Sequence, residues 1–143
     1  MKPVNIRFYR AREINFANKV ENGTKIEFEN KYSYNVNYAS GQNVGKGIIN
    51  LSAISKNDPK KFFVSIELEG VFDYDPSLTK EQVHVESFNQ LFPYAKSLIS
   101  TVSAASGIPP IMVPAIDISQ QSIYRYDMRN PFGNNQNEGE DEE

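Results

Sequence analysis

Alternation of apolar and polar residues in the first half of the chain constrains the fold most strongly. Apolar and polar side chains alternate along four successive segments, with interruptions in the first two, which is the pattern of strands with one buried face. The segments cover residues 4–16, 26–38, 49–53 and 62–68. Turn-forming sequences separate them, the strongest being Asn22-Gly23. Parallel strands would need crossover connections of about a dozen residues or more, so these short loops predict a four-stranded antiparallel sheet with meander topology.

The apolar spacing changes in the second half of the chain. Apolar residues recur every three or four positions over residues 88–102, which predicts a long helix with one apolar stripe, ended by Gly107. Pro93 lies inside the stripe, so the helix should either begin late, close to this proline, or kink there. The proline-rich residues 108–114 predict an extended connector, and residues 118–128 a short C-terminal helix. The predicted fold class is therefore α+β.

Acidic residues are concentrated at the C-terminus. The chain of 143 residues has a formal net charge of −3, yet its last six residues carry five acidic groups. The remainder, at +2, has no clustered stripe of lysine or arginine, which argues against nucleic acid as a partner. We expect one folded domain over residues 1–129 and a disordered acidic tail over residues 130–143. The tail either keeps the protein in solution or docks on a basic partner.

Residues with catalytic or metal-binding chemistry are few. The chain has no cysteine and one histidine, His84, which stands in a polar stretch and is expected on the solvated surface. The segment 41–47 resembles a phosphate-binding loop but is one spacer short and lacks Ser or Thr after Lys46. Glu67 and Glu69 alternate with apolar residues and should lie on a solvated strand face. We expect no enzymatic activity, no cofactor and no metal site.

The hydropathy of the chain bears on where it acts. No apolar run approaches the roughly 18–20 residues that a membrane helix needs, and no basic, apolar stretch of signal-peptide type begins the sequence. We therefore expect a cytoplasmic protein without direct membrane insertion.

Three tyrosines share one face of the second predicted strand. Tyr32, Tyr34 and Tyr38 stand at even spacing, and tyrosine combines a large contact area with a polar tip. Two interpretations are open. The tyrosines either form an ordinary sheet core or leave an accessible aromatic surface that adapts to many partners.

The helix sequence resembles that of a known family. Leu91-Phe92-Pro93-Tyr94-Ala95-Lys96, followed by Leu98-Ile99 and Gly107, is similar to the helix signature of the SecB family of protein-export chaperones. The first-strand segment Arg12-Glu13-Ile14-Asn15-Phe16 also resembles that family, as do the connector residues Pro109, Ile111, Val113, Pro114 and Ile116. The resemblance spans roughly residues 4–128. It implies an α+β fold in a homotetramer, a dimer of dimers, that binds unfolded precursor polypeptides in apolar grooves without nucleotide or metal.

Site residues follow from the resemblance. It implies contacts to client polypeptides at Tyr32, Tyr34, Tyr38, Phe63, Phe72, Val113, Ile116, Ile123 and Tyr124. Members of the family pass precursors to the SecA motor through acidic residues on the first and last strands. Glu13 matches one of these positions, whereas the other matching positions hold Ala17 and Ser65.

Three functional hypotheses result. The first is a general chaperone of the holdase type, which keeps precursors competent for translocation and export. The second is an adaptor or structural protein with a single partner, which the missing acidic residues favour. The third is a SecB-like chaperone that guards an antitoxin.

Overall fold

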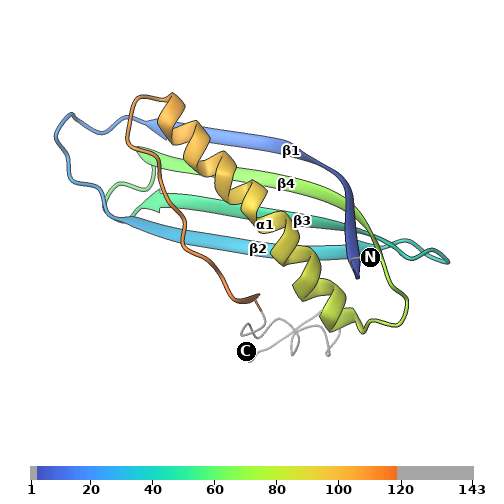
Figure 1. The fold of residues 1–143 in the computed structure, drawn as a ribbon. Coiled ribbons are helices and arrows are strands. Elements are labelled where there is room, and N and C mark those ends of the chain that lie inside the picture. Colours follow the sequence, from blue (N-terminus) through green and yellow to red (C-terminus); the bar gives the residue numbers. More distant parts are fainter. Residues whose placement is uncertain (1–2, 119–143) are drawn as a thin grey trace.

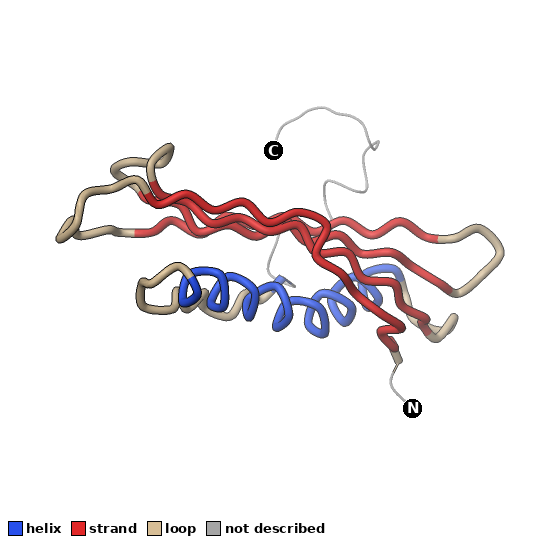
Figure 2. The backbone as a smooth tube through the Cα atoms, turned by 90° about the horizontal axis from the view of Figure 1, so that it is seen from above, coloured by secondary structure: helices blue, strands red, loops and turns tan. Residues whose placement is uncertain are grey.

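The computed structural model describes residues 3–118, which form one four-stranded sheet and one long helix (Figure 1). The strands are β1 (Val4–Asn18), β2 (Phe28–Tyr38), β3 (Val44–Ser55) and β4 (Phe62–Tyr74), and the helix is α1 (Lys80–Ala105). Figure 2 shows two layers, with α1 lying across one face of the sheet. We call this the helix face and the opposite one the outer face. The predicted short helix over residues 118–128 and the predicted tail lie outside the described residues, apart from Ile118.

All strand pairs are antiparallel, as predicted, but the order is β1-β4-β3-β2. The strands β2, β3 and β4 follow one another as a meander, whereas β1 lies beside β4, so the predicted meander is wrong for the first strand. Asn22-Gly23 does form a turn, with Gly23 at φ 84°, but it belongs to a nine-residue connection between β1 and β2. This connection is long enough to span three strand spacings, about 14 Å. It carries the chain to the far edge and leaves β4, whose helix face is fully apolar, in the interior of the sheet.

Two irregularities in β1 decide which way its side chains point. The pairing register with β4 shifts at Arg7 and again at Arg12, as expected for β-bulges. Each bulge moves the following side chains to the opposite face. Phe8, which alternates with Ile6 in the sequence, therefore pairs with Val71 on the outer face and is 55% exposed. The second bulge restores the original phase, so the apolar positions after it return to the helix face.

The helix α1 begins at Lys80, so the predicted late start near Pro93 is wrong. A capping box explains the early start: Thr79 accepts a hydrogen bond from the Gln82 backbone, and the Gln82 side chain accepts one from the Thr79 backbone. Pro93 is exposed on the side away from the sheet. Apolar side chains on both sides of it are buried, so packing on the sheet stabilises the helix across the hydrogen bond that proline cannot make.

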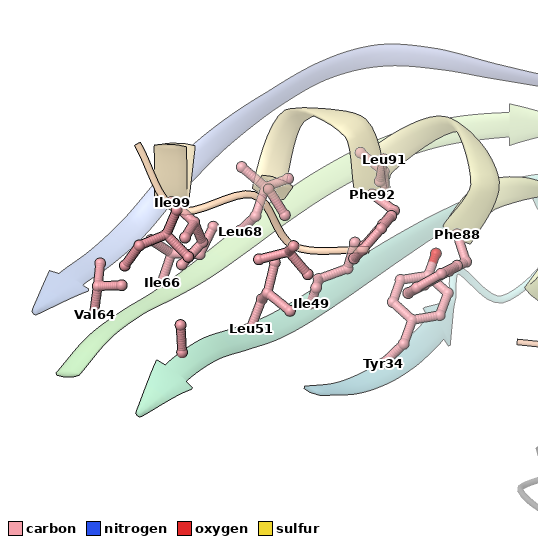
Figure 3. Packing of buried hydrophobic residues seen from close by; sticks show 14 of the residues in the cluster. Tyr34, Ile49, Leu51, Val64, Ile66, Leu68, Phe88, Leu91, Phe92 and Ile99 are labelled. Atoms are coloured by element: carbon pink, nitrogen blue, oxygen red, sulfur yellow. The ribbon is translucent and has the colours of Figure 1, made fainter. Parts of the chain in front are cut away.

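The core lies between α1 and the helix face (Figure 3). Its largest buried side chains come from β2, β3, β4 and α1: Tyr34, Ile49, Leu51, Phe62, Leu68, Phe88, Leu91 and Ile99. Two glycines allow close packing. A Cβ on Gly70 would overlap the Leu91 side chain, and one on Gly47 would lie 2.8 Å from Cε1 of Tyr34. The Tyr34 ring therefore packs over Gly47 of β3, and its hydroxyl reaches Ser87 of α1.

Candidate functional site

An apolar groove of about 580 Å³ opens at the end of the sheet where β1 ends and β2 begins. One wall is the β1–β2 connection and the other is the segment that follows α1. Figure 1 shows both segments at the same end of the molecule, at the left of the view. The apolar lining residues are Val20, Ile26, Phe28, Phe62, Ile108, Pro109, Pro110, Ile111 and Met112. Polar residues of the β1–β2 connection, including Asn22 and Thr24, form the remaining rim.

Aromatic residues make the floor of the groove. Phe28 and Phe62 lie with ring centroids 5.2 Å apart, and Phe16 meets Phe62 edge-on at 5.8 Å. Phe62 is fully buried, whereas Phe28 is partly exposed. Alternation places Phe28 on the helix face at the start of β2, where the helix layer has already ended. The floor is therefore apolar and incompletely covered.

Hydrogen bonds from two residues hold the wall after α1 to the helix, and Ile111 makes the shorter ones. The Ile108 backbone N–H donates to the Ser103 carbonyl at 3.4 Å. The Ser100 hydroxyl donates to the Ile111 carbonyl at 2.7 Å, and the Ile111 backbone N–H donates to Oγ of Ser103 at 2.9 Å. The next residue, Met112, is 72% exposed. Among the large hydrophobic side chains within residues 3–118, this is the highest exposed fraction. A flexible, polarizable thioether thus stands at the mouth of the groove.

Three of the predicted client contacts lie in the core instead. Tyr34, Phe72 and Val113 are each at most 1% exposed. The Tyr34 hydroxyl is hydrogen-bonded to Oγ of Ser87 on α1, and burial raises the pKa of Tyr34. Even spacing correctly placed Tyr34 on the apolar sheet face, but α1 covers this position. In the folded protein these three side chains have no surface to offer a client.

The other predicted contacts are distributed over separate surfaces. Tyr32 is half-buried beneath Phe88, with ring centroids 5.9 Å apart. Tyr38, near the opposite end of β2, packs edge-on against Tyr74 and has the Lys80 ammonium 3.9 Å above its ring. Phe63 lies on the outer face, and Ile116 packs against the main core from the connector. Ile123 and Tyr124 lie outside the described residues.

The groove residues were not among the predicted contacts. Ile26 and Phe28 continue the alternation of the tyrosines on β2, and Met112 is one of several apolar residues between the prolines, so signals for them were present. The pairing of these two segments was not visible, because they are more than 80 residues apart in the sequence.

Acidic residues meet on the outer face. Glu13 of β1 is directly opposite Glu67 of β4, and Asn15 donates a hydrogen bond to Glu13 at 2.9 Å. The Arg12 guanidinium lies 3.4 Å from the Glu67 carboxylate. Both glutamates line a shallow polar hollow of about 320 Å³, to which Ser65 also contributes. Ala17 lies further along β1, opposite Phe63.

Glu69 departs from the expectation of a solvated carboxylate. Its side chain is only 6% exposed and forms ion pairs with Arg10 at 2.8 Å and Lys46 at 3.2 Å. Hydrogen bonds from these two cations lower its pKa. Glu69 therefore joins β1, β4 and β3 across the outer face and has a structural role.

His84 also differs from its prediction. It is buried on α1, with its ring 5.0 Å from that of Tyr34, and burial lowers its pKa. The charged and amide side chains before it, Glu81 and Gln82, are exposed, whereas position 84 is buried like Val83 and Ser87.

Within residues 3–118, no helix is long and apolar enough to cross a membrane. The same part of the chain contains no group of three or more His, Cys, Asp or Glu side chains that could hold a metal ion.

Comparisons with known proteins identify the architecture. No protein-family profile matches the chain. The SecB-like chaperone Rv1957 of Mycobacterium tuberculosis, solved with a ChAD peptide from the antitoxin HigA1, superimposes with a TM-score of 0.64 at 14% identity. The match covers 80% of this chain and 91% of that one. The chain has the SecB-like fold. At this identity the superposition shows the fold alone. The superposition confirms the fold that was expected from the helix sequence.

Sequence comparisons agree with this fold. The protein-export protein SecB of Rhodospirillum centenum is 26% identical over 84 residues, which cover 56% of this chain and 49% of that protein. The uncharacterized protein MJ0357 of Methanocaldococcus jannaschii is 34% identical over 77 residues, half of each chain. The SecB-like chain thus matches about half the length of these curated relatives.

Proposed function

We propose that this SecB-like chain is a holdase that binds unfolded or precursor polypeptides in the groove between the β1–β2 connection and the segment after α1. The observation that carries the proposal is the apolar lining of this groove, in which Met112 is exposed at the mouth and Phe28 is partly exposed on the floor. A groove of this size accepts one or two large side chains, and its apolar lining suits the apolar residues of an unfolded client.

The energetics fit capture without sequence specificity. Each apolar client side chain that is fully buried contributes about 1.5–3 kcal/mol, so a few weak contacts together retain an extended segment. Thioether and proline walls impose few hydrogen-bonding requirements, because Pro109 and Pro110 have no backbone N–H. Shape and polarity of the client are therefore weakly restricted.

Further client contacts are proposed along β2 and the connector. Tyr32 is on the same face of β2 as Phe28 and Asn30, so an extended client leaving the groove along this strand would meet it after Asn30. Ile116, Ile123 and Tyr124 belong to the chain beyond the groove wall and are retained in the proposal on the family resemblance. Tyr38 and Phe63 are retained on the same ground.

We also propose that the protein is a homo-oligomer, with the tetramer as the expected state. The edge strand β1 supports this, because in the described structure only one of its edges is paired. Large apolar side chains gather beside this edge on the helix face: Tyr9, stacked on Tyr94 at 4.1 Å, and Ile14 are each more than 40% exposed. A second copy added along β1 would cover them.

Handover to an export motor such as SecA is a proposal that rests on the outer face. Glu67 stands opposite Glu13 and supplies a second carboxylate where Ala17 and Ser65 do not. Because Glu67 is already paired with Arg12, Glu13 is the carboxylate that we propose for contact with a basic partner.

A second candidate function is the guarding of an antitoxin. The solved SecB-like chaperone Rv1957 holds a peptide from an antitoxin, and this chain shares its fold. The two functions differ in client range. A general holdase binds many unfolded polypeptides with similar affinity, whereas a dedicated guard binds one sequence far more tightly than the rest.

Suppression of aggregation tests the proposal. The purified full chain is added to a chemically unfolded, slowly refolding client, and light scattering follows aggregation. Met112→Asp places a charge at the groove mouth and should weaken suppression at least fivefold. Phe8→Asp is the matched control, since Phe8 is an exposed apolar residue on the outer face. Absence of suppression by the folded wild-type oligomer, or equal loss in both variants, would refute the groove as the holdase site.

A further inference from the structure

The connector after α1 is fastened to the helix through both backbone groups of one residue. Ser100 donates to the carbonyl of Ile111, and Ser103 accepts from its N–H. The Ser103 hydroxyl has two carbonyl acceptors within α1, that of Ile99 at 2.9 Å and that of Ser100 at 3.0 Å, so its proton points into the helix and its lone pairs face the connector. Two side chains thus do for Ile111 what a neighbouring strand does for a residue in a sheet.

These hydrogen bonds hold a connector that has no regular secondary structure of its own. Residues 109–117 form no helix or strand, and prolines at positions 109, 110 and 114 have no N–H to donate. Ile111 is in the middle of this stretch, and its side chain is buried in the core. Holding its backbone therefore sets the path of Pro110 on one side and of Met112 on the other.

The same residues line the groove. Pro110, Ile111 and Met112 form its connector wall, and Oγ of Ser100 lies 3.7 Å from the Met112 sulfur. A displacement of Ile111 away from α1 changes the distance from this wall to Phe28 on the floor. The two serines contact the connector, and act on a client only through it.

We propose that Ser100 and Ser103 are positioning residues that set the width of the groove, and thereby determine which client side chains it accepts. This inference rests on the proposed holdase function. Ser103 has the larger effect, because its loss leaves the buried N–H of Ile111 without an acceptor, and movement of the connector into water relieves this. Loss of Ser100 leaves the Ile111 carbonyl without its donor, and water reaches this carbonyl more easily than it reaches the Ile111 N–H.

The test uses the full chain with Ser103→Ala, Ser100→Ala and the conservative variant Ser100→Thr, which keeps the hydroxyl. Ser97→Ala is the control, because Ser97 is exposed on the same helix. The rate of amide hydrogen exchange at Ile111, measured without any client, reports whether Ser100 and Ser103 hold the Ile111 backbone. Fluorescence anisotropy then compares two soluble, permanently unfolded polypeptides of equal length and charge. One carries valine and the other tryptophan at its apolar positions.

Ser103→Ala should accelerate exchange at Ile111 at least tenfold and change the ratio of the two affinities at least threefold in favour of the tryptophan polypeptide. Ser100→Ala should do the same to a smaller extent, while Ser100→Thr and Ser97→Ala stay within twofold of wild type. Unchanged exchange, or an equal loss of affinity for both polypeptides, would overturn the inference. Failure of the wild type to bind either polypeptide would refute the holdase proposal instead. The exchange rates would still decide whether the two serines hold the Ile111 backbone.

Discussion

The same substitution at two tyrosines of β2 should destabilise the protein at one position and not at the other. Tyr34 and Tyr32 are two positions apart on the helix face, and both have hydroxyl groups shielded from solvent. The Tyr34 hydroxyl is bonded to Ser87, whereas among the described residues the Tyr32 hydroxyl has no hydrogen-bond partner. Phenylalanine removes the hydroxyl and keeps the ring, so neither substitution creates a large cavity.

The sizes of the two effects follow from these environments. For Tyr34→Phe the lost bond contributes about 0.5–1.5 kcal/mol, and a buried partner left unpaired adds to this. Ser87 retains a 3.2 Å bond to the His84 carbonyl, so the expected total is about 1–2 kcal/mol. Tyr32→Phe removes a shielded hydroxyl that makes no bond, and should be neutral or stabilise by up to about 1 kcal/mol.

Denaturant unfolding at one fixed protein concentration measures both values, since assembly makes apparent stability depend on concentration. A double-mutant cycle with Ser87→Ala should give a coupling of about 1 kcal/mol with Tyr34→Phe and near zero with Tyr32→Phe. Client affinity should not change in Tyr34→Phe. Equal effects of the two substitutions, or no coupling to Ser87, would show that the hydrogen bond does not hold β2 to α1. A loss of client affinity without loss of stability would return Tyr34 to the client surface.

Three further predictions concern other parts of the fold. The folded-state pKa of His84 lies below its ordinary value of 6.5, so the unfolded chain binds the proton more readily. The unfolding free energy of the wild type should therefore be at its plateau above pH 6.5 and fall as the pH drops through the folded-state pKa. In His84→Leu the dependence of the unfolding free energy on pH should be flatter. Denaturant titrations at several pH values measure both. Gly47→Ala should destabilise by about 1–3 kcal/mol, because the new methyl group would lie 2.9 Å from Cζ of the buried Tyr34; a midpoint equal to wild type would contradict this packing. Tyr9→Glu should reduce the mass measured by light scattering, while Phe8→Glu on the opposite face should leave it unchanged; an intact oligomer in Tyr9→Glu would exclude this edge as the interface.

Much of the secondary structure could be predicted because each element carries its own signal. A strand with one face in the core must alternate, and a helix lying on a sheet must present one stripe. These local requirements correctly identified four antiparallel strands and the stripe that contains Leu91 and Ile99. The start of α1 was not predicted, because Pro93 was expected to end or kink a helix. The capping box at Thr79 and the buried side chains on both sides of Pro93 stabilise the helix in spite of the proline.

Tertiary structure alone decided which faces are covered and which segments meet. The even spacing of Tyr32, Tyr34 and Tyr38 states only that they share a sheet face; the path of α1 buries Tyr34 more fully than the other two. Phe8 has the spacing of a core residue, yet a bulge at Arg7 turns it to the outer face, because bulges depend on pairing with β4. The groove joins the β1–β2 connection to residues 108–112. The sequence determined which apolar residues each segment carries, but their meeting depends on the strand order and the length of α1, which are set by packing of the whole chain.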